Sequence, residues 1–462
     1  MAHAETAPVE VTHGRMFRIA VPMMLSHITV PLLGLVDATV IGRLGDAALL
    51  GAVALGAAVF DYLFWTFGAL RMGTAGLTAQ AVGARDRQGV SETLARAFAV
   101  GGAIGLLLLA LQVPIAWGAF AIIGASDAVD AAFAEYFAIR IWAAPVTLMN
   151  YALLGTLTGR GRTDLGFLTQ VVQNLANVAL TIWLVVGLEW GVAGAALGTV
   201  IGETIGFALG LAIVVRLGDN PLRARRAALF DPVALKRMLA VNGDIMIRTI
   251  ALMVAFIGFQ SLSARSGDVT LAANAVLLNV FLIGGYFLDG FATAAEAIGG
   301  QAYGAKRPRA FRRAAGIAVL WAHVFGALLS AGFYVGGAAF IDFVSTDPEV
   351  REAARLYLVF AALTPLAGAL AFAHDGVFIG ATWTAALRNT MLAALAVYIA
   401  LLYLLQDLGN TALWLSFLVF LVARGLGQQL LFPRLAARGL PLEAPAPAPA
   451  PVAGDPASPR SD

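Results

Sequence analysis

The chain has 462 residues, of which 60% are hydrophobic and 13% are charged, about half the charged share of a typical soluble domain. A water-soluble protein of this length could not cover its surface with so few charges, so the composition excludes a soluble enzyme, a nucleic-acid-binding module and a disordered scaffold. The net charge of +2 carries little information as a total, and the absence of cysteine excludes disulfides, thiolate metal sites and cysteine nucleophiles. The sequence therefore predicts an integral membrane protein.

Twelve apolar segments are long enough to cross a bilayer, since a spanning helix needs about 20 residues. In chain order they cover residues 17–41, 49–80, 95–123, 133–158, 165–188, 190–215, 238–262, 269–302, 314–343, 355–380, 386–406 and 411–432. None alternates polar and apolar residues with a period of two, as the strands of a membrane barrel do. The predicted fold class is an all-α integral membrane protein with twelve transmembrane helices.

Lysine and arginine gather in the loops that follow even-numbered segments and at the two ends of the chain, for example around Arg85, Arg225 and Arg312. The loops on the opposite side hold few of them. Because basic residues remain on the cytoplasmic side of a membrane protein, both termini are predicted to be cytoplasmic. We expect a multi-pass protein of a bacterial-type inner membrane.

One motif occurs twice in the chain. Gln80-Ala-Val-Gly-Ala-Arg85 recurs as Gln301-Ala-Tyr-Gly-Ala-Lys306, a separation of 221 residues (301 − 80), and the same separation relates Gly155 to Gly376. This constant register predicts a duplicated six-helix unit. Six is an even number, so both units enter the membrane from the same side, which is a known transporter architecture.

The repeat divides the chain into five regions. They are a cytoplasmic N-terminal segment (1–16), an N-lobe (17–215), a cytoplasmic linker (216–237), a C-lobe (238–433) and a disordered Pro/Ala-rich tail (434–462). The linker contains two helix-breaking Pro positions and several arginines, and the tail lacks the apolar residues that a packed structure needs.

Ionisable side chains inside hydrocarbon are costly and usually face the bundle interior or a wet cavity. Asp37 is the clearest case, because no basic residue lies within four positions of it in the first predicted helix. Pro22 and Pro31 precede it and are able to kink the helix. A carboxylate that binds a proton or cation on a hinged helix couples ion binding to conformational change. The alternative is a hydrogen-bonded carboxylate with a packing role.

Other polar residues lie in the predicted helices of both halves. Asn174, Asn177 and Thr181 are expected to line a polar cavity or to join neighbouring helices. Asp244 and Arg248 are four residues apart, a spacing that favours a structural pair on one helix face.

Several acids have no obvious partner on their own helix. Asp289, Glu296 and Asp375 form, with Asp244 and Arg248, a candidate polar site in the C-lobe. The alternative for these acids and for Glu203 is pairing across helices with arginines, namely Arg71, Arg140 or Arg424. The membrane histidines do not have the spacing of metal ligands and are expected to be hydrogen-bonded polar residues.

Several ordered motifs resemble the multidrug and toxic compound extrusion (MATE) family, specifically its DNA-damage-inducible protein F (DinF) branch. They include Arg18-Ile-Ala-Val-Pro-Met-Met, Pro31-Leu-Leu-Gly-Leu-Val-Asp37, Asn242-Gly-Asp-Ile-Met-Ile-Arg248 and Leu288-Asp-Gly-Phe-Ala-Thr-Ala-Ala-Glu296. The resemblance extends over residues 15–435. It implies two six-helix lobes around a V-shaped cavity and cation-coupled export of amphipathic organic molecules.

The resemblance also implies roles for individual residues. Asp37 matches the helix-1 aspartate whose protonation or cation binding drives transport, and Pro22 matches the proline where this helix bends. Asn177 and Thr199 match an N-lobe polar network. Asp375 resembles the helix-10 aspartate of the NorM-like branch, whose helix-7 glutamate is not evident in this sequence.

One position departs from the family pattern. Related DinF-like proteins commonly carry an aspartate one turn after the second helix-5 asparagine, where this chain has Thr181. The N-lobe then lacks a second carboxylate. This favours coupling to a single proton through Asp37 over Na⁺, because Na⁺ prefers several hard oxygen ligands whereas a proton needs one carboxylate.

The sequence thus predicts a proton-coupled antiporter, not an enzyme, that exports amphipathic or cationic organic compounds by alternating access. We expect a monomer in the lipid bilayer, with no cofactor, no metal and no nucleic-acid partner. The alternative is a lipid or polysaccharide-precursor flippase of the same superfold. An intramembrane enzyme and a major-facilitator transporter fit the motifs less well.

Overall fold

The computed structural model describes the backbone of residues 10–43, 46–123 and 126–440. A few side chains within these ranges are not described, and that of Asp37 is one of them. Most of the predicted tail, from residue 441 onward, lies outside the described residues. The described chain is almost entirely helical, in agreement with the predicted fold class.

The helices occupy all twelve predicted segments. Those of the first half are α1 (His13–Gly42), α2 (Ala47–Thr66), α3 (Ala69–Gly83), α4 (Arg87–Ala110), α5 (Gln112–Ile123), α6 (Asp127–Arg140), α7 (Ala144–Gly159), α8 (Thr163–Ile182) and α9 (Gly191–Arg216). The linker contains a 3₁₀ turn and α10 (Arg226–Leu229), and the second half contains α11 (Pro232–Arg265), α12 (Asp268–Gly304), α13 (Pro308–Val344), α14 (Pro348–Gly380), α15 (Thr384–Leu404) and α16 (Asn410–Gly439).

Eleven segments of the described chain are long and apolar enough to cross a membrane, and in two of them consecutive helices, α2 with α3 and α6 with α7, form one segment. α1, with 30 residues, occupies the remaining predicted segment. Large apolar side chains such as Trp117, Val335 and Phe343 are 75%, 83% and 89% exposed, as residues that contact lipid are. The chain is a multi-pass membrane protein.

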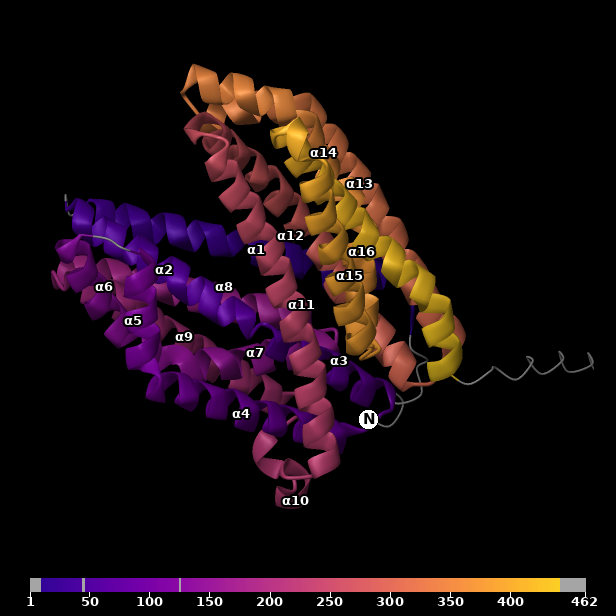
Figure 1. The fold of residues 1–462 in the computed structure, drawn as a ribbon. Helices are drawn as coiled ribbons and strands as arrows, with labels where there is room; N and C mark the ends of the chain where they lie inside the picture. Colours follow the sequence, from indigo (N-terminus) through magenta and orange to yellow (C-terminus); the bar gives the residue numbers. More distant parts are fainter. Residues whose placement is uncertain (1–9, 44–45, 124–125, 441–462) are drawn as a thin grey trace, which may run out of the picture.

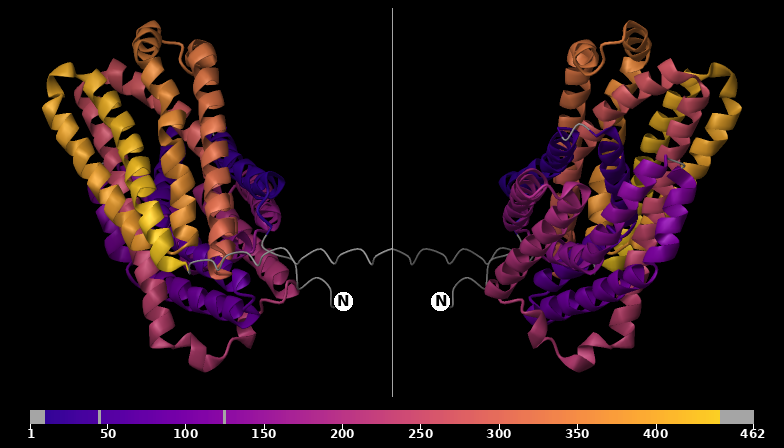
Figure 2. Two further views of the ribbon diagram at one scale, coloured as in Figure 1. Left: turned by 90° about the vertical axis from the view of Figure 1, so that its right-hand side faces the viewer. Right: turned by 90° about the vertical axis from the view of Figure 1, so that its left-hand side faces the viewer.

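The helices form two bundles that diverge at one end and meet at the other (Figure 1). Seen from one side of the molecule the orange and yellow helices lie in front, and seen from the other the indigo and magenta helices do (Figure 2). α1 connects the bundles, because Met16, Ile19 and Met24 on its first half are buried in the apolar cluster formed mainly by α12, α13 and α14. The rest of the first half has a separate core.

The turns confirm the repeat. Arg85 and Lys306 have φ values of 60° and 54°, and Gly161 and Thr382 have 71° and 56°. Each pair is separated by 221 residues, and the left-handed conformation is uncommon for residues other than glycine. Two copies of the same turn geometry, in the same register, show that the two halves share one internal architecture.

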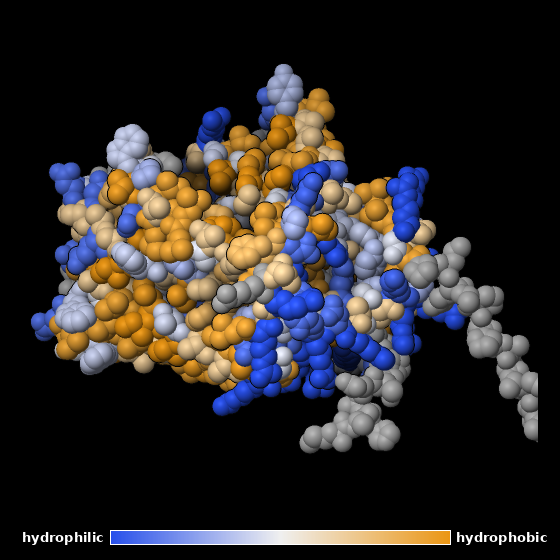
Figure 3. All heavy atoms as spheres, turned by 90° about the horizontal axis from the view of Figure 1, so that it is seen from below, coloured by the Kyte–Doolittle hydropathy of each residue, from blue (hydrophilic) through white to orange (hydrophobic). Residues whose placement is uncertain are grey.

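The end where the bundles meet carries the basic residues. Seen from below, hydrophilic side chains gather on this face between areas of hydrophobic surface (Figure 3). Exposed basic residues at the ends of α3 and α12 and at the start of α11 include Arg85, Lys236, Lys306 and Arg307. This is the end that the distribution of lysine and arginine predicts to be cytoplasmic.

Two boundaries differ from the prediction. α11 begins at Pro232 rather than 238, because Asp231 accepts a hydrogen bond from Val233 N at 2.9 Å and caps the helix, while proline fits its first position. α16 continues to Gly439 through Pro433, so the predicted start of the tail at 434 is wrong. There the helix is held by packing, since Gly439 lies against the ring of Tyr303.

Glycines allow the two bundles to touch at the basic end. A Cβ atom at Gly83 would lie 2.0 Å from the carbonyl oxygen of Gln301, and one at Gly304 would lie 2.1 Å from that of Gln80. These two contacts are equivalent in the repeat (83 + 221 = 304). Both are with backbone atoms, which cannot swing aside, so α3 and α12 depend on glycine for this approach.

We expect the double variant Gly83→Ala/Gly304→Ala to separate the bundles at this end. A single cysteine in place of Ala79, which is fully buried between them, reports the separation through labelling by a membrane-impermeant maleimide, and the native chain contains no cysteine. Labelling should rise about tenfold for a shift of about 1.4 kcal/mol. Gly316→Ala, which meets nothing within 4 Å, is the control; equal labelling of both variants would contradict the prediction.

Candidate functional site

Two glutamines join the bundles at the basic end. Gln80 on α3 donates from Nε2 to the carbonyl oxygen of Gly380 on α14 at 2.9 Å, and Gln301 on α12 donates to that of Gly159 on α7 at 2.8 Å. Each bond crosses from one half to the other. Donors and acceptors are both equivalent in the repeat, so these bonds form a twofold pair around the contact of α3 with α12.

Each glutamine is held by an arginine from the opposite half. Arg237 on α11 donates to Oε1 of Gln80 at 2.8 Å, and Arg15 on α1 donates to Oε1 of Gln301 at 2.5 Å. We call these four side chains the glutamine clamp. Hydrogen bonds to charged donors are about twice as strong as neutral ones, so the clamp stabilises the closed end. The repeated motif drew attention to both glutamines, but the sequence indicated no role for them.

A second contact between the halves lies farther along α1 and α12. Nε2 of His27 is 2.7 Å from Oδ2 of Asp289, and both side chains are partly exposed, at 24% and 29%. The ring of His27 also stacks on that of Tyr286, with centroids 5.8 Å apart. His27 is a polar residue with a partner, as the sequence predicts, and its partner is one of the predicted C-lobe acids.

The buried acid of α14 is surrounded by cationic and amide donors. Asp375 accepts hydrogen bonds from Arg248, from Arg424 at 2.8 Å and from Gln428 at 2.6 Å. Both carboxylate oxygens are therefore occupied, and the two arginines exceed the charge of the acid. Cross-helix pairing, the alternative reading for Asp375, is confirmed.

The predicted pair of Asp244 with Arg248 is wrong. Asp244 accepts from Arg388 at 2.5 Å and from Thr384 at 2.9 Å, both on α15. The two residues share a helix face, but a buried acid on α14 attracts Arg248, and a nearer cation on α15 neutralises Asp244. The spacing of two residues in the sequence shows only that they share a face of one helix. Which side chain each of them pairs with depends on the helices packed against that face.

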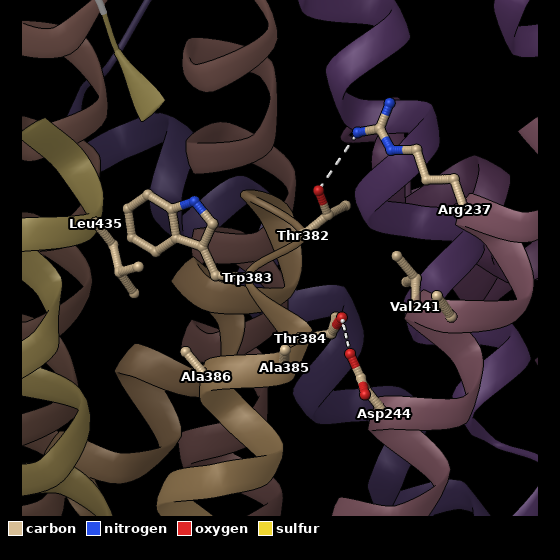
Figure 4. A pocket seen from close by; sticks show the side chains of 10 residues that line it. Arg237, Val241, Asp244, Thr382, Trp383, Thr384, Ala385, Ala386 and Leu435 are labelled. Atoms are coloured by element: carbon tan, nitrogen blue, oxygen red, sulfur yellow. Dashed lines mark hydrogen bonds between the residues drawn. The ribbon is translucent and has the colours of Figure 1, made fainter. Parts of the chain in front are cut away.

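Asp244 lines a pocket of 320 Å³ between α11, the α14–α15 turn and α16. Figure 4 shows Thr384 pointing toward Asp244 and Arg237 of the clamp pointing toward Thr382, to which it donates at 3.4 Å. The predicted C-lobe site is therefore divided: Asp244 lies in this pocket beside the clamp, Asp289 contacts His27, and Arg248 binds Asp375. Glu296, the fifth member, has no hydrogen bond or ion pair with the described residues.

The predicted N-lobe residues come together in two groups. Asn177 donates to Thr199 at 3.0 Å and accepts from Thr181 at 3.4 Å, which joins α8 to α9. Asn174 instead donates to Thr29 on α1 at 3.2 Å. Asn177 and Thr181 are 2% and 0% exposed, so in this conformation they link helices and do not face a cavity.

α1 carries the predicted coupling residue. Its helix is continuous through Pro22 and includes Asp37, whose side chain lies outside the described residues. Ser26 also donates a hydrogen bond to Gln170 on α8, next to the contact of Thr29. These two bonds tie the middle of α1 to α8, about two turns before Asp37. The roles of Asp37 as coupling residue and of Pro22 as hinge remain predictions.

The first half contains a buried ion pair that the sequence left as an alternative. Arg140 on α6 donates to Glu203 on α9 at 2.5 Å, and Thr147 donates to the same carboxylate. The guanidinium also lies over the rings of Phe60 and Phe64, 5.3 Å from each centroid. These contacts give the pair the partners that burial requires.

Two lobes of six membrane helices, joined at one end and carrying ionisable groups between them, define a membrane transporter of the two-lobe type. The family model described as MatE matches residues 22–183 and 245–404, and the chain belongs to this family of transporters, which are not enzymes. Members of the family handle small organic compounds.

Among curated proteins, the chain is 38% identical over 421 residues to "DNA damage-inducible protein F" of Escherichia coli, covering 89% of this chain and 90% of the relative. It is 28% identical to "Probable multidrug resistance protein NorM" of Caulobacter vibrioides, covering 78% and 76%. The crystal structure of the Vibrio cholerae MATE transporter VcmN in the bent form matches with a TM-score of 0.84, 20% identity and coverage of 92% and 97%. This last match supports the fold.

Removing the clamp should favour opening of the basic end. We expect Gln80→Ala/Gln301→Ala to increase maleimide labelling of a cysteine at Ala79, and each single variant to have a smaller effect, because each hydrogen bond contributes about 1 kcal/mol. Gln88→Ala, which removes a local bond to Glu92, is the control. Labelling of the double variant at the level of this control would refute a closing role for the clamp.

Proposed function

We propose that this MATE transporter is a proton-coupled antiporter that exports amphipathic, cationic organic compounds by alternating access, with both termini in the cytoplasm of a bacterial cell. The observation that carries the proposal is the twofold closure of the basic end by the glutamine clamp. Lysine and arginine mark a cytoplasmic face, so the end at which the bundles diverge faces outward. The likeness to relatives named as multidrug resistance proteins supports the substrate class.

The closure at this end is built from contacts that can be replaced. Hydrogen bonds of the clamp, backbone contacts at Gly83 and Gly304 and the apolar packing of the first half of α1 hold the lobes together. Each lobe also has an apolar core of its own. Breaking the clamp would therefore allow the lobes to rotate without unfolding either one. Alternating access between two rigid halves needs this separation of weak and strong contacts.

The state of Asp375 supports protons over Na⁺ as the coupling ion. In the NorM-like branch the corresponding aspartate contributes to cation coupling, but here Arg248 and Arg424 already neutralise the carboxylate. A Na⁺ ion at this position would meet two guanidinium groups and no free carboxylate oxygen. Cation binding by the C-lobe aspartate is therefore disfavoured by charge repulsion.

In the proposed cycle, ionised Asp37 attracts the cationic compound from the cytoplasm. Once the lobes open outward, protonation of Asp37 removes the negative charge and the compound leaves. Inward return releases the proton. The contacts of Ser26 and Thr29 with α8 hold the preceding turns of α1, so a change at Asp37 acts on the part of the helix beyond them.

We expect Asp37→Asn to abolish uptake of ethidium driven by a pH gradient in proteoliposomes, and a Na⁺ gradient to drive no uptake by the wild-type protein. Asp342→Asn is the matched control, because Asp342 is a partly exposed acid paired with Arg355 near the end of a helix. Uptake by Asp37→Asn equal to that of Asp342→Asn would rule out Asp37 as the coupling residue, and uptake driven by Na⁺ alone would rule out proton coupling.

A further inference from the structure

Five acidic side chains are buried among the described residues: Glu92, Glu203, Asp219, Glu296 and Asp375. Four of them bind an arginine from another part of the chain, respectively Arg225, Arg140, Arg160 and, for Asp375, Arg248. Glu296 is the exception. It is 4% exposed, and its Oε1 atom is buried with no hydrogen-bond partner. Of the buried carboxyl groups that the structure describes, Glu296 is thus the one without an arginine partner.

Glu296 lies on the face of α12 that is turned toward the first half. Asp289 and Gly300 occupy the same face, seven residues before and four residues after it. Asp289 contacts His27 on α1, and a Cβ atom at Gly300 would lie 2.6 Å from that of Ala79 on α3. The carboxyl group is therefore placed between the lobes, one turn from their closest contact.

The opposite lobe supplies a cation without a partner. Arg71 on α3 is half-buried and forms no hydrogen bond or ion pair with the described residues. Arg71 lies on the same face of α3 as Ala79, about two helical turns before it, and Ala79 faces Gly300 of α12. An acid of one lobe and a base of the other thus lie on the facing sides of α12 and α3 but do not form an ion pair with each other in this conformation.

Several other described ionisable groups on helices packed against α12 have partners of their own. His27 contacts Asp289, Arg248 binds Asp375, Asp244 binds Arg388, and His323 and His374 bond to the carbonyl groups of Val319 and Leu370. Tyr151 on α7 is neutral at ordinary pH. Within the part of the chain that the structure describes, Arg71 is the cation available to Glu296.

A packing role does not account for the carboxyl group. The residue equivalent to Glu296 in the first half is Ala75 (296 − 221 = 75), which is 1% exposed at the corresponding contact. In the first half, the methyl group of an alanine is therefore sufficient for packing at this position. The glutamate adds a titratable group to one lobe at the contact between the two.

We propose that Glu296 is a second proton-binding site of the transport cycle, and that Arg71 expels its proton when the lobes rearrange. The proposal rests on the proton coupling proposed above. In the conformation seen here the group is a carboxylic acid, its proton taken from water between the lobes, because a buried carboxylate without a partner is much less favourable. When α3 shifts against α12, the guanidinium pairs with the carboxylate, and the proton leaves to water on the opposite side.

Proton release on addition of ethidium to the purified protein, in weakly buffered detergent solution, tests this role. We expect Glu296→Gln to release about half as many protons as the wild-type protein, because one of two sites is lost. Arg71→Met should retain both sites but release the Glu296 proton at a pH higher by about one unit or more, because the opposing positive charge is gone. Unchanged proton release by Glu296→Gln would overturn the proposal.

Thermal unfolding in detergent provides a readout independent of transport. Glutamine resembles the carboxylic acid, so Glu296→Gln should unfold at the wild-type temperature. The matched variant Glu203→Gln should unfold at a lower temperature, because it leaves Arg140 buried without its counter-charge. A loss of stability in Glu296→Gln as large as in Glu203→Gln would show a charged structural residue and overturn the proposal.

The outcomes separate this proposal from the proposed function. If the wild-type protein releases no proton and a pH gradient drives no ethidium uptake, proton coupling itself fails, and the role of Glu296 fails with it. If the wild-type protein releases protons, Asp37→Asn reduces the release, and Glu296→Gln does not, only the second site is refuted.

Discussion

A buried charge in a membrane protein needs a partner, and this requirement organises the interior of both lobes. Arg140 with Glu203 in one lobe and Asp375 with Arg248 in the other hold helices that are distant in sequence. Glu203 and Arg424, the second arginine that binds Asp375, occupy equivalent positions (203 + 221 = 424), so an acid in one lobe corresponds to a base in the other. The two lobes therefore share a backbone architecture, but their buried ion pairs are formed by different residues.

The same requirement distinguishes the polar contacts within each lobe from those between the lobes. The ion pairs Arg140–Glu203 and Arg248–Asp375 within the lobes are buried and supported by further hydrogen bonds. The polar contacts between the lobes include the glutamine clamp and the partly exposed pair of His27 with Asp289. A hydrogen bond that water can replace costs little to break. The contacts between lobes are therefore the ones that a transport cycle is able to exchange, and Glu296 lies among them.

Much of this organisation could be read in advance. Hydrophobic length predicted the twelve helical segments, and the separation of 221 residues predicted the repeat that the turns at Arg85 and Lys306 display. Partners across helices could not be read in the same way. The pair predicted from the spacing of Asp244 and Arg248 was wrong, because helical spacing brings residues onto one face without saying which other helix that face meets.

The sequence by itself determined the features that depend only on the order of residues. These are the number and length of the apolar segments, the side that carries the basic residues, and the motifs of the family. The tertiary structure decided which side chains meet. It made Gln80 and Gln301 a twofold clamp. Of the five buried acids that the structure describes, four bind an arginine and Glu296 does not. The physical reason is that the free energy of a buried polar group depends on its neighbours in space, which the order of residues does not specify.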